Sequence, residues 1–221
     1  DGVDASIIQT DGKSEYKVIL DKYFEYPESI YNDLTTLRDK IKISKDLKKL
    51  QKKIKSIEKD ITIFHAESVQ KILKKTRVNV DFIGFHGQTI FHNSKEKISR
   101  QLGDGKLLSK LTKKKVVYDF RLNDLKNGGE GAPLVPIFHQ ILEKKLIRKK
   151  EADKHIQPVH FVNIGGVANR TTITEDLFED FSFSATDIGP GMCLIDRWVR
   201  ENSKKNYDKN GNIAKAGKIN I

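Results

Sequence analysis

The stretch between residues 159 and 200 constrains the fold more than any other part of this chain. Runs rich in β-branched and aromatic residues predict strands at 159–162, 167–173 and 181–186. A helix should follow, because apolar residues then recur at helical spacing: Leu194, Ile195, Trp198 and Val199. With the strand and helix patterns that begin near residue 78, this alternation predicts an α/β fold with a mixed sheet.

Glycines separate these strands at two points where a ligand could approach the backbone. Gly165 and Gly166 follow Asn163 after the first strand, and glycine can adopt positive φ with no side chain in the way. Gly189 and Gly191 flank a proline just before the helix. The free amides at the start of a helix attract anions, phosphate above all. The second turn therefore predicts a phosphate site.

Asp187 stands at the predicted end of the third strand, just before this second turn. A carboxylate near a bound phosphate is repelled by it, so the placement suggests chemistry in which Asp187 deprotonates a nucleophile. The alternative is that Asp187 merely caps the following helix. The residues alone leave both interpretations open on equal terms.

The first eighty residues or so predict a hairpin followed by helices. Residues 5–9 and 16–21 have the pattern of two strands joined by an Asp-Gly turn. Apolar positions at helical spacing then predict three helices between about residues 28 and 76, with the third at about 61–76. We expect these helices to form a layer over the sheet, and a coiled-coil partner surface is the alternative.

A strand predicted at residues 78–85 ends in polar residues. His86 follows it directly, and Gln88 comes two positions later. Ligand sites in α/β sheets favour the C-terminal ends of strands. Both side chains can donate and accept hydrogen bonds with sugar hydroxyls, or they can form a polar turn that satisfies its own backbone.

Another strand, predicted at residues 116–118, is followed by Asp119 and Arg121. Asp119 suits a hydroxyl group, and Arg121 suits a carboxylate held in a bidentate pair. The alternative is that these two residues pair with each other for purely structural reasons. A short helix is expected before this strand, at 106–112. A glycine-rich loop at 128–133, whose amides could face a ligand, leads into a helix expected at 134–147.

Charge and cysteine content narrow the classes of function. The net charge is +11, but the lysines are spread through helices and loops with few aromatics among them, which favours solvated faces over a nucleic-acid surface. The single cysteine, Cys193, excludes an intramolecular disulfide and a Cys-rich metal site. The sequence has no apolar run long enough to span a membrane and no signal-peptide pattern, so we expect a cytoplasmic location.

Several of these stretches together resemble the anhydro-N-acetylmuramic acid kinases. The similar segments, in family order, are DGVDAS at Asp1, HGQT at His86, QLGDG at Gln101, DFRLNDLKNGGEGAPLVPIFH at Asp119, NIGGVAN at Asn163, DIGPGM at Asp187 and AGKIN near the end. A lone GGxGAP would be weak evidence, but ordered blocks over most of the chain are specific.

The resemblance implies a fold of the actin-like, hexokinase-like ATPase superfamily, with two lobes built on ribonuclease-H-like sheets and a nucleotide in the cleft. The N-terminal lobe would comprise residues 1–150, with its helical block at about 28–76, and residues 155–221 would begin an incomplete second lobe. The boundary would fall in the polar stretch at 149–154. The resemblance further implies a fragment that lacks both ends of the family pattern.

The family uses ATP and Mg²⁺ to phosphorylate anhydro-N-acetylmuramic acid while water opens the internal anhydro bond, in peptidoglycan recycling for the cell wall. Asp187 matches the family's catalytic aspartate. No direct metal ligand is implied, and the partners are the sugar and ATP, without nucleic acid or membrane; a homodimer is compatible with the pattern. The matched substrate-binding positions are His86, Gln88, Asp119, Arg121, Gly129 and Glu130. The matched ATP- and phosphate-binding positions are Asp1, Gly2, Asn163, Gly165, Gly166, Gly189 and Gly191.

Two positions depart from the family pattern. Glu130 stands where the family usually has Gln, so an amide donor becomes an anion. Met192 stands where the family usually has Asn after Gly-Pro-Gly, which removes a polar contact. The alternative function is therefore an inactive remnant of such a kinase that retains at most sugar binding.

Overall fold

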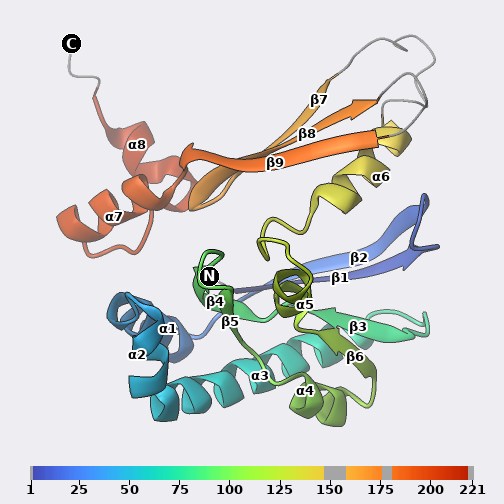
Figure 1. Cartoon of the computed structure of the whole chain (residues 1–221). Helices are drawn as coiled ribbons and strands as arrows, with labels where there is room; N and C mark the ends of the chain where they lie inside the picture. The colour runs from blue at the N-terminus through green and yellow to red at the C-terminus, as the bar shows by residue number, and fades with distance from the viewer. Residues whose placement is uncertain (1, 147–157, 176–180, 219–221) are drawn as a thin grey trace. The chain divides into compact units, whose positions relative to one another are not determined.

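The computed structural model describes residues 2–146, 158–175 and 181–218 (Figure 1). It divides into two compact units, Asp1–Leu134 and Val135–Ile221. Both units combine helices and strands, as the predicted α/β class requires. The boundary predicted at residues 149–154 lies outside the described residues, and the division into units comes earlier in the chain, before α6 (Pro136–Leu146).

The first unit opens with the predicted hairpin. Strands β1 (Gly2–Thr10) and β2 (Tyr16–Glu25) pair antiparallel. Asp11 closes their turn, because its carboxylate accepts hydrogen bonds from the amides of Lys13, Ser14 and Glu15 at 2.8–3.0 Å. These backbone bonds hold the pKa of Asp11 well below its usual range.

The helical block contains the three predicted helices with one boundary corrected. They are α1 (Glu28–Lys40), α2 (Ser44–Lys49) and α3 (Gln51–Leu73). The predicted break near residue 60 is wrong, because the apolar spacing through Ile57 and Ile61 continues uninterrupted and α3 runs as one helix. In the described ranges, none of the helices combines the length and apolar character that crossing a membrane needs.

The main core of the first unit lies between these helices and the hairpin. Leu34, Leu37 and Ile61 are fully buried. The hairpin contributes Val3, Ile7 and Phe24, so the helices pack on this two-stranded sheet, whereas we expected them to cover one mixed sheet (Figure 1). Because the apolar face of α3 is buried within this core, that face is not available as a coiled-coil surface.

Two short ladders complete the first unit. Strands β3 (Phe82–Phe85) and β6 (Lys115–Tyr118) pair in parallel, while β4 (Gln88–Asn93) and β5 (Ile98–Leu102) pair antiparallel. Helices α4 (Gly105–Thr112) and α5 (Phe120–Lys126) follow β5 and β6. The strand predicted at 78–85 is shorter than expected, and β4, β5 and α5 were not predicted at all. The described strands form four separate sheets where we expected one mixed sheet.

The second unit is built on an antiparallel meander. Strands β7 (Val159–Ile164), β8 (Val167–Glu175) and β9 (Phe181–Pro190) pair in that order, and α6 packs against β8 and β9. They lead to α7 (Cys193–Asn202), the short η1 turn (Lys209–Gly211) and α8 (Asn212–Ala216). The third strand was predicted too short: β9 continues to Pro190, so Asp187 lies inside it and pairs with Asn169.

Few apolar side chains of the described second unit are buried. Ala168, Ile173 and Val199 are buried, and His139 stacks on Phe161 with ring centres 4.7 Å apart. By contrast, apolar side chains of β7 and α7 face solvent, with 62% of Ile164, 60% of Leu194 and 60% of Trp198 exposed. The predicted apolar face of α7 exists, but within this unit it has little to pack against.

We expect Ile61→Ala to lower the free energy of unfolding by about 2–5 kcal/mol, because it leaves a cavity at a fully buried position of α3. Lys59→Ala on the exposed side of the same helix is the control and should change stability by no more than about 0.5 kcal/mol. Denaturant unfolding of both variants measures the difference, and similar values would contradict the assigned core.

Stability should also fall in mild acid because of His65. Burial lowers the pKa of His65, although its bond to the Ile61 carbonyl opposes this. The unfolded chain therefore takes up the proton first, so this contribution is intact above about pH 6.5 and is lost as the pH falls through the lowered pKa. Unfolding measured from about pH 7.5 to about pH 5 should show a shallower pH slope for His65→Phe. Equal slopes would contradict this role.

Candidate functional site

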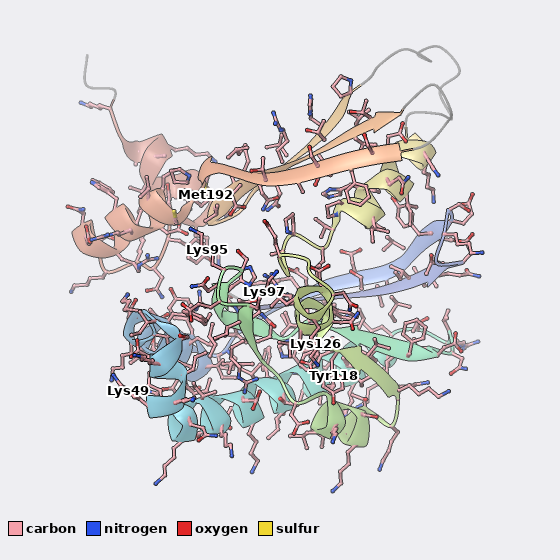
Figure 2. All side chains as sticks on the ribbon, viewed as in Figure 1. Lys49, Lys95, Lys97, Tyr118, Lys126 and Met192 are labelled. Atoms are coloured by element: carbon pink, nitrogen blue, oxygen red, sulfur yellow. The ribbon has the colours of Figure 1, made fainter. Side chains whose placement is uncertain are left out.

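The parallel strands β3 and β6 bring two predicted site residues to one sheet edge. Phe85 and Tyr118 are register partners at the last position of each strand (Figure 2 labels Tyr118). The next residues along the chain are His86 and Asp119. Because both strands run in the same direction, these two side chains start from neighbouring carboxyl ends, where α/β folds place ligands.

His86 is bonded to Arg121 in a defined protonation state. The Arg121 Nε group donates to His86 Nε2 at 3.0 Å, and His86 Nδ1 lies 2.9 Å from the Gly87 carbonyl oxygen. A carbonyl only accepts, so Nδ1 carries the proton and Nε2 keeps its lone pair. Burial lowers the pKa of His86, the bond to Gly87 opposes this shift, and the Arg121 charge adds to it. Burial also lowers the pKa of Arg121.

The Asp119 carboxylate accepts no hydrogen bond within the part of the chain that the structure describes. Its backbone is left-handed, with φ 61° and ψ 33°, and it occupies the position before α5 without a side-chain capping bond. The structural alternative was a pair between Asp119 and Arg121, but among the described residues Arg121 bonds His86 instead. A non-glycine residue held in this conformation is uncommon, and such residues cluster at functional sites.

The HGQT and QLGDG stretches pack directly on each other. Gly87 has φ 72°, and a Cβ there would run into the carbonyl of Leu102. A Cβ on Gly103 would likewise overlap the ring of Phe85. Gln88 begins β4 opposite Leu102, with Tyr26 Oη 3.5 Å from its Oε1 atom. Close packing therefore requires glycine at Gly87 and Gly103. Gln88 retains most of its hydrogen-bonding capacity.

Helix α3 holds the QLGDG stretch by hydrogen bonds from residues that the sequence patterns did not single out. Glu58 accepts from the Gly103 amide at 3.1 Å and from Arg100 at 2.8 Å. Thr62 accepts from the Asp104 amide at 3.0 Å. Thr62 is polar yet fully buried, which only the structure reveals, and buried polar groups are normally hydrogen-bonded.

The glycine-rich loop after α5 is held by Asp124, another residue that the sequence patterns left without a role. Its carboxylate accepts from the Gly131 amide at 2.7 Å, and its carbonyl accepts from the Gly129 amide at 2.9 Å. Lys97 donates to the Gly129 carbonyl at 2.9 Å (labelled in Figure 2). These amides serve the loop itself, which is a correction to the expectation that they face a ligand. Glu130 is exposed on this loop.

In the second unit, the two glycine turns bind each other. The Gly166 carbonyl accepts from the amides of Gly191 and Cys193, at 3.0 and 3.2 Å, and the Gly165 carbonyl accepts from Met192 at 2.7 Å. The prediction that the amides entering α7 are free for an anion is therefore wrong for these three. The lack of a side chain at Gly191 also has a packing cause, because a Cβ would overlap the Gly165 carbonyl.

Asp187 does not cap α7, so the helix-cap interpretation is wrong. The capping position is Met192, without a side-chain capping bond. Asp187 is exposed and lies beside a β-bulge, where Ile188 is the extra residue between the pairs to Asn169 and Ala168. Among the described residues its carboxylate accepts no hydrogen bond. Bulges re-aim side chains and are frequent next to active sites.

The remaining predicted phosphate-binding positions have different surroundings. A Cβ on Gly2 would run into the carbonyl of Phe24, whereas a Cβ on Gly166 or Gly189 would meet open space, and Gly189 has φ 150°. Asn163 pairs with Asn169 across the β7–β8 hairpin. Asp1 lies outside the described residues. Within those residues, no group of three or more His, Cys, Asp or Glu side chains is placed to hold a metal ion.

Comparison with known proteins gives one consistent result. The family model described as "Anhydro-N-acetylmuramic acid kinase" matches residues 1–221. Proteins carrying that same name are 52% identical over 218 residues in Pelagibacter ubique, and 36% identical over 222 residues in both Agrobacterium fabrum and Rhizobium etli. Each alignment covers 99% of this chain but 56–57% of the relative, so the chain spans little more than half of their length.

The two turns of the second unit offer a test that separates packing from ligand binding. Gly191→Ala should destabilise the unit by about 1–3 kcal/mol, because its Cβ would overlap the Gly165 carbonyl. Gly166→Ala meets open space and should leave the melting temperature nearly unchanged. Thermal unfolding of both variants checks this, and equal stability would argue against the contact between the turns.

Proposed function

Because the chain belongs to the anhydro-N-acetylmuramic acid kinase family, we propose that it binds anhydro-N-acetylmuramic acid and takes part in its ATP-dependent phosphorylation. The proposed reaction opens the anhydro ring with water and produces N-acetylmuramic acid 6-phosphate, an intermediate of peptidoglycan recycling. The observation that carries this proposal is the joint position of His86, Arg121 and Asp119 at the carboxyl ends of two neighbouring strands.

We assign the sugar to these residues of the first unit. The substrate is an acid, and Arg121 is a half-buried cation without a carboxylate partner among the described residues, so it suits the carboxylate of the sugar. Asp119 and Gln88 have unused acceptors for hydroxyl groups. Gly129 and Glu130 belong to a loop that Asp124 holds in one conformation, which pre-organises its contribution.

Phosphates of ATP are proposed to lie against the glycine turns of the second unit. Gly166 and Gly189 leave open space beside the backbone, so they are better candidates for close approach than Gly191, which packs on Gly165. Asn163 and the N-terminal Asp1 and Gly2 remain predictions for the same role. Mg²⁺ would arrive on the phosphates of ATP, since no acidic cluster of the described residues suits it, and it would neutralise phosphate charge.

Asp187 is the proposed general base. Its carboxylate accepts the proton of a water molecule as the water oxygen bonds to the anomeric carbon of the sugar. The bond from that carbon to the bridging oxygen breaks, and the released oxygen attacks the γ-phosphoryl group, with ADP as the leaving group. An exposed carboxylate without a capping role is free to perform this proton transfer.

The family membership also supports a finer assignment of the fold. We propose that the first unit belongs to the N-terminal lobe of an actin-like, hexokinase-like ATPase, and that the second unit belongs to the other lobe. The meander of β7, β8 and β9 and the parallel pair of β3 and β6 are compatible with ribonuclease-H-like sheets. The cytoplasmic location and a homodimer stay predictions.

Anhydro-N-acetylmuramic acid should raise the melting temperature of the chain, since a ligand that binds only the folded state stabilises it. At about a hundred times its Kd the gain is about 2.7 kcal/mol. Arg121→Gln should reduce the shift, while Arg77→Gln serves as a control on an exposed arginine. The absence of any shift for a folded protein would rule out the sugar site. Sugar binding without turnover is the result expected of an inactive remnant.

Asp187→Asn should lower sugar-dependent ADP release by about a hundredfold or more, because the amide keeps the size of the side chain but removes the base. The melting temperature and sugar affinity should stay nearly unchanged, since Asp187 caps no helix. Asp21→Asn, an exposed strand carboxylate in β2, is the matched control. The phosphorylated sugar and ADP are measured for each protein.

Unchanged turnover in Asp187→Asn would remove Asp187 from the mechanism. The base would then be assigned to Asp119, whose carboxylate makes no capping bond to α5. Asp119→Asn would be measured in the same assay, and normal turnover there would exclude both carboxylates.

A further inference from the structure

We propose that His86 is a positioning residue that orients the guanidinium group of Arg121, so that this site selects anhydro sugars bearing a carboxylate over neutral ones. This inference rests on the proposed function, because the sugar is its ligand. It assigns His86 a role different from the expected direct contact with sugar hydroxyls. Both ring nitrogens of His86 are already used within the protein.

The charge of Arg121 points to an anionic ligand. The side chain is half-buried, and among the described residues no carboxylate lies within ion-pair distance of it. Its Nε–H group donates to a neutral imidazole. Cations removed from water are normally paired, so the missing counter-charge is expected from the ligand.

The bond to His86 also decides which nitrogens of the Arg121 guanidinium can bind a ligand. Since Nε is occupied by His86, and no hydrogen bond within the described ranges uses the two terminal nitrogens, those nitrogens remain for the ligand. Two parallel N–H groups at the end of a guanidinium match the two oxygens of one carboxylate. A neutral sugar offers no such group and would leave this fork unpaired, which is the physical source of the selectivity.

His86 is itself rigidly supported. Its Nδ1–H group donates to the carbonyl of Gly87, which is held in a left-handed turn against the backbone of Leu102. Because Gly87 has no room for a side chain, this turn cannot shift without disturbing β5. β5 therefore holds Gly87 in place, Gly87 holds the ring of His86, and His86 holds the guanidinium of Arg121. Without this contact, the long side chain of Arg121 would sample many rotamers.

The arrangement requires a neutral imidazole, which makes acid recognition depend on pH. A protonated His86 carries N–H groups on both nitrogens, so it cannot accept from Arg121 and would oppose it as a second cation. Arg121 is the charged group bonded to the ring. The neighbouring acids Asp124 and Asp104 accept bonds from loop and helix amides, and Asp119 lies one residue before α5. Tyr118 and Tyr26 are the nearby phenols on adjoining elements.

The test compares the affinity of two probes, anhydro-N-acetylmuramic acid and neutral 1,6-anhydro-N-acetylglucosamine, by calorimetry at about pH 7.5 and about pH 5.5. Their ratio defines the acid preference. In the unsubstituted protein this preference should fall at the lower pH. In His86→Phe it should fall about tenfold or more at the higher pH, because the guanidinium loses its support.

His86→Gln is the conservative variant. Its amide can donate to Gly87 and accept from Arg121 without titrating, so the acid preference should be largely kept and should no longer change with pH. In an Arg121→Gln background, His86→Phe should have no further effect on the preference, since the residue it positions is gone. Melting temperatures of all variants identify any that fail to fold, and His86→Gln keeps the test decisive if His86→Phe does.

The outcomes separate this inference from the proposed function. If the unsubstituted protein binds neither probe, the proposed sugar site is wrong and the inference fails with it. If both probes bind but His86→Phe weakens them equally, the sugar site stands and the positioning role is overturned. Nitrogen-15 NMR of the imidazole gives a ligand-free check: the proton should be on Nδ1, and a proton on Nε2 in the neutral ring would also overturn the proposal.

Discussion

The first unit depends on the burial of one face of α3. Ile54, Ile57 and Ile61 on this helix anchor the core against the hairpin and α1. Glu58 and Thr62, from the same stretch of helix, accept hydrogen bonds from the loop between β5 and α4. Apolar burial sets where the helix lies, and these directed bonds then fix the loop against it. The QLGDG stretch thus owes its conformation to a helix that lies some forty residues earlier in the chain.

Glycine has two different tasks in the motifs of this chain. At Gly87, Gly103 and Gly191 a side chain would collide with another backbone or ring, so glycine is needed for packing. At Gly166 and Gly189 the backbone borders open space, which a phosphate could use. The glycine turns of the second unit therefore combine one position where glycine is needed for packing, Gly191, with positions where a side chain would meet open space, Gly166 and Gly189. The assignment of ATP contacts under the proposed function follows the open ones.

The candidate sugar site is organised by charge. Among the described residues, half-buried Arg121 has no carboxylate partner and the Asp119 carboxylate accepts no hydrogen bond, while His86 accepts the Arg121 bond as a neutral imidazole. The carboxylate of Asp124, by contrast, accepts a hydrogen bond from the Gly131 amide of the neighbouring loop. Charged side chains that have no partner within the protein, next to others that do, are candidates for binding a ligand. This is the physical basis of the proposed sugar site and of the proposed role of His86.

Local patterns in the sequence were enough to predict the mixed α/β class, the hairpin, the three strands of the second unit and the family, because these rest on periodicity, turn residues and ordered motifs. They also indicated that His86 and Asp119 follow strand ends. The folded chain was needed to establish that these two strands are parallel neighbours, that Arg121 bonds His86 rather than Asp119, and that Asp187 lies inside β9. Strand pairing and side-chain partners join residues far apart in the chain, so local patterns carry no information about them. The same holds for the amides before α7, which looked free in sequence and are occupied by the carbonyls of Gly165 and Gly166.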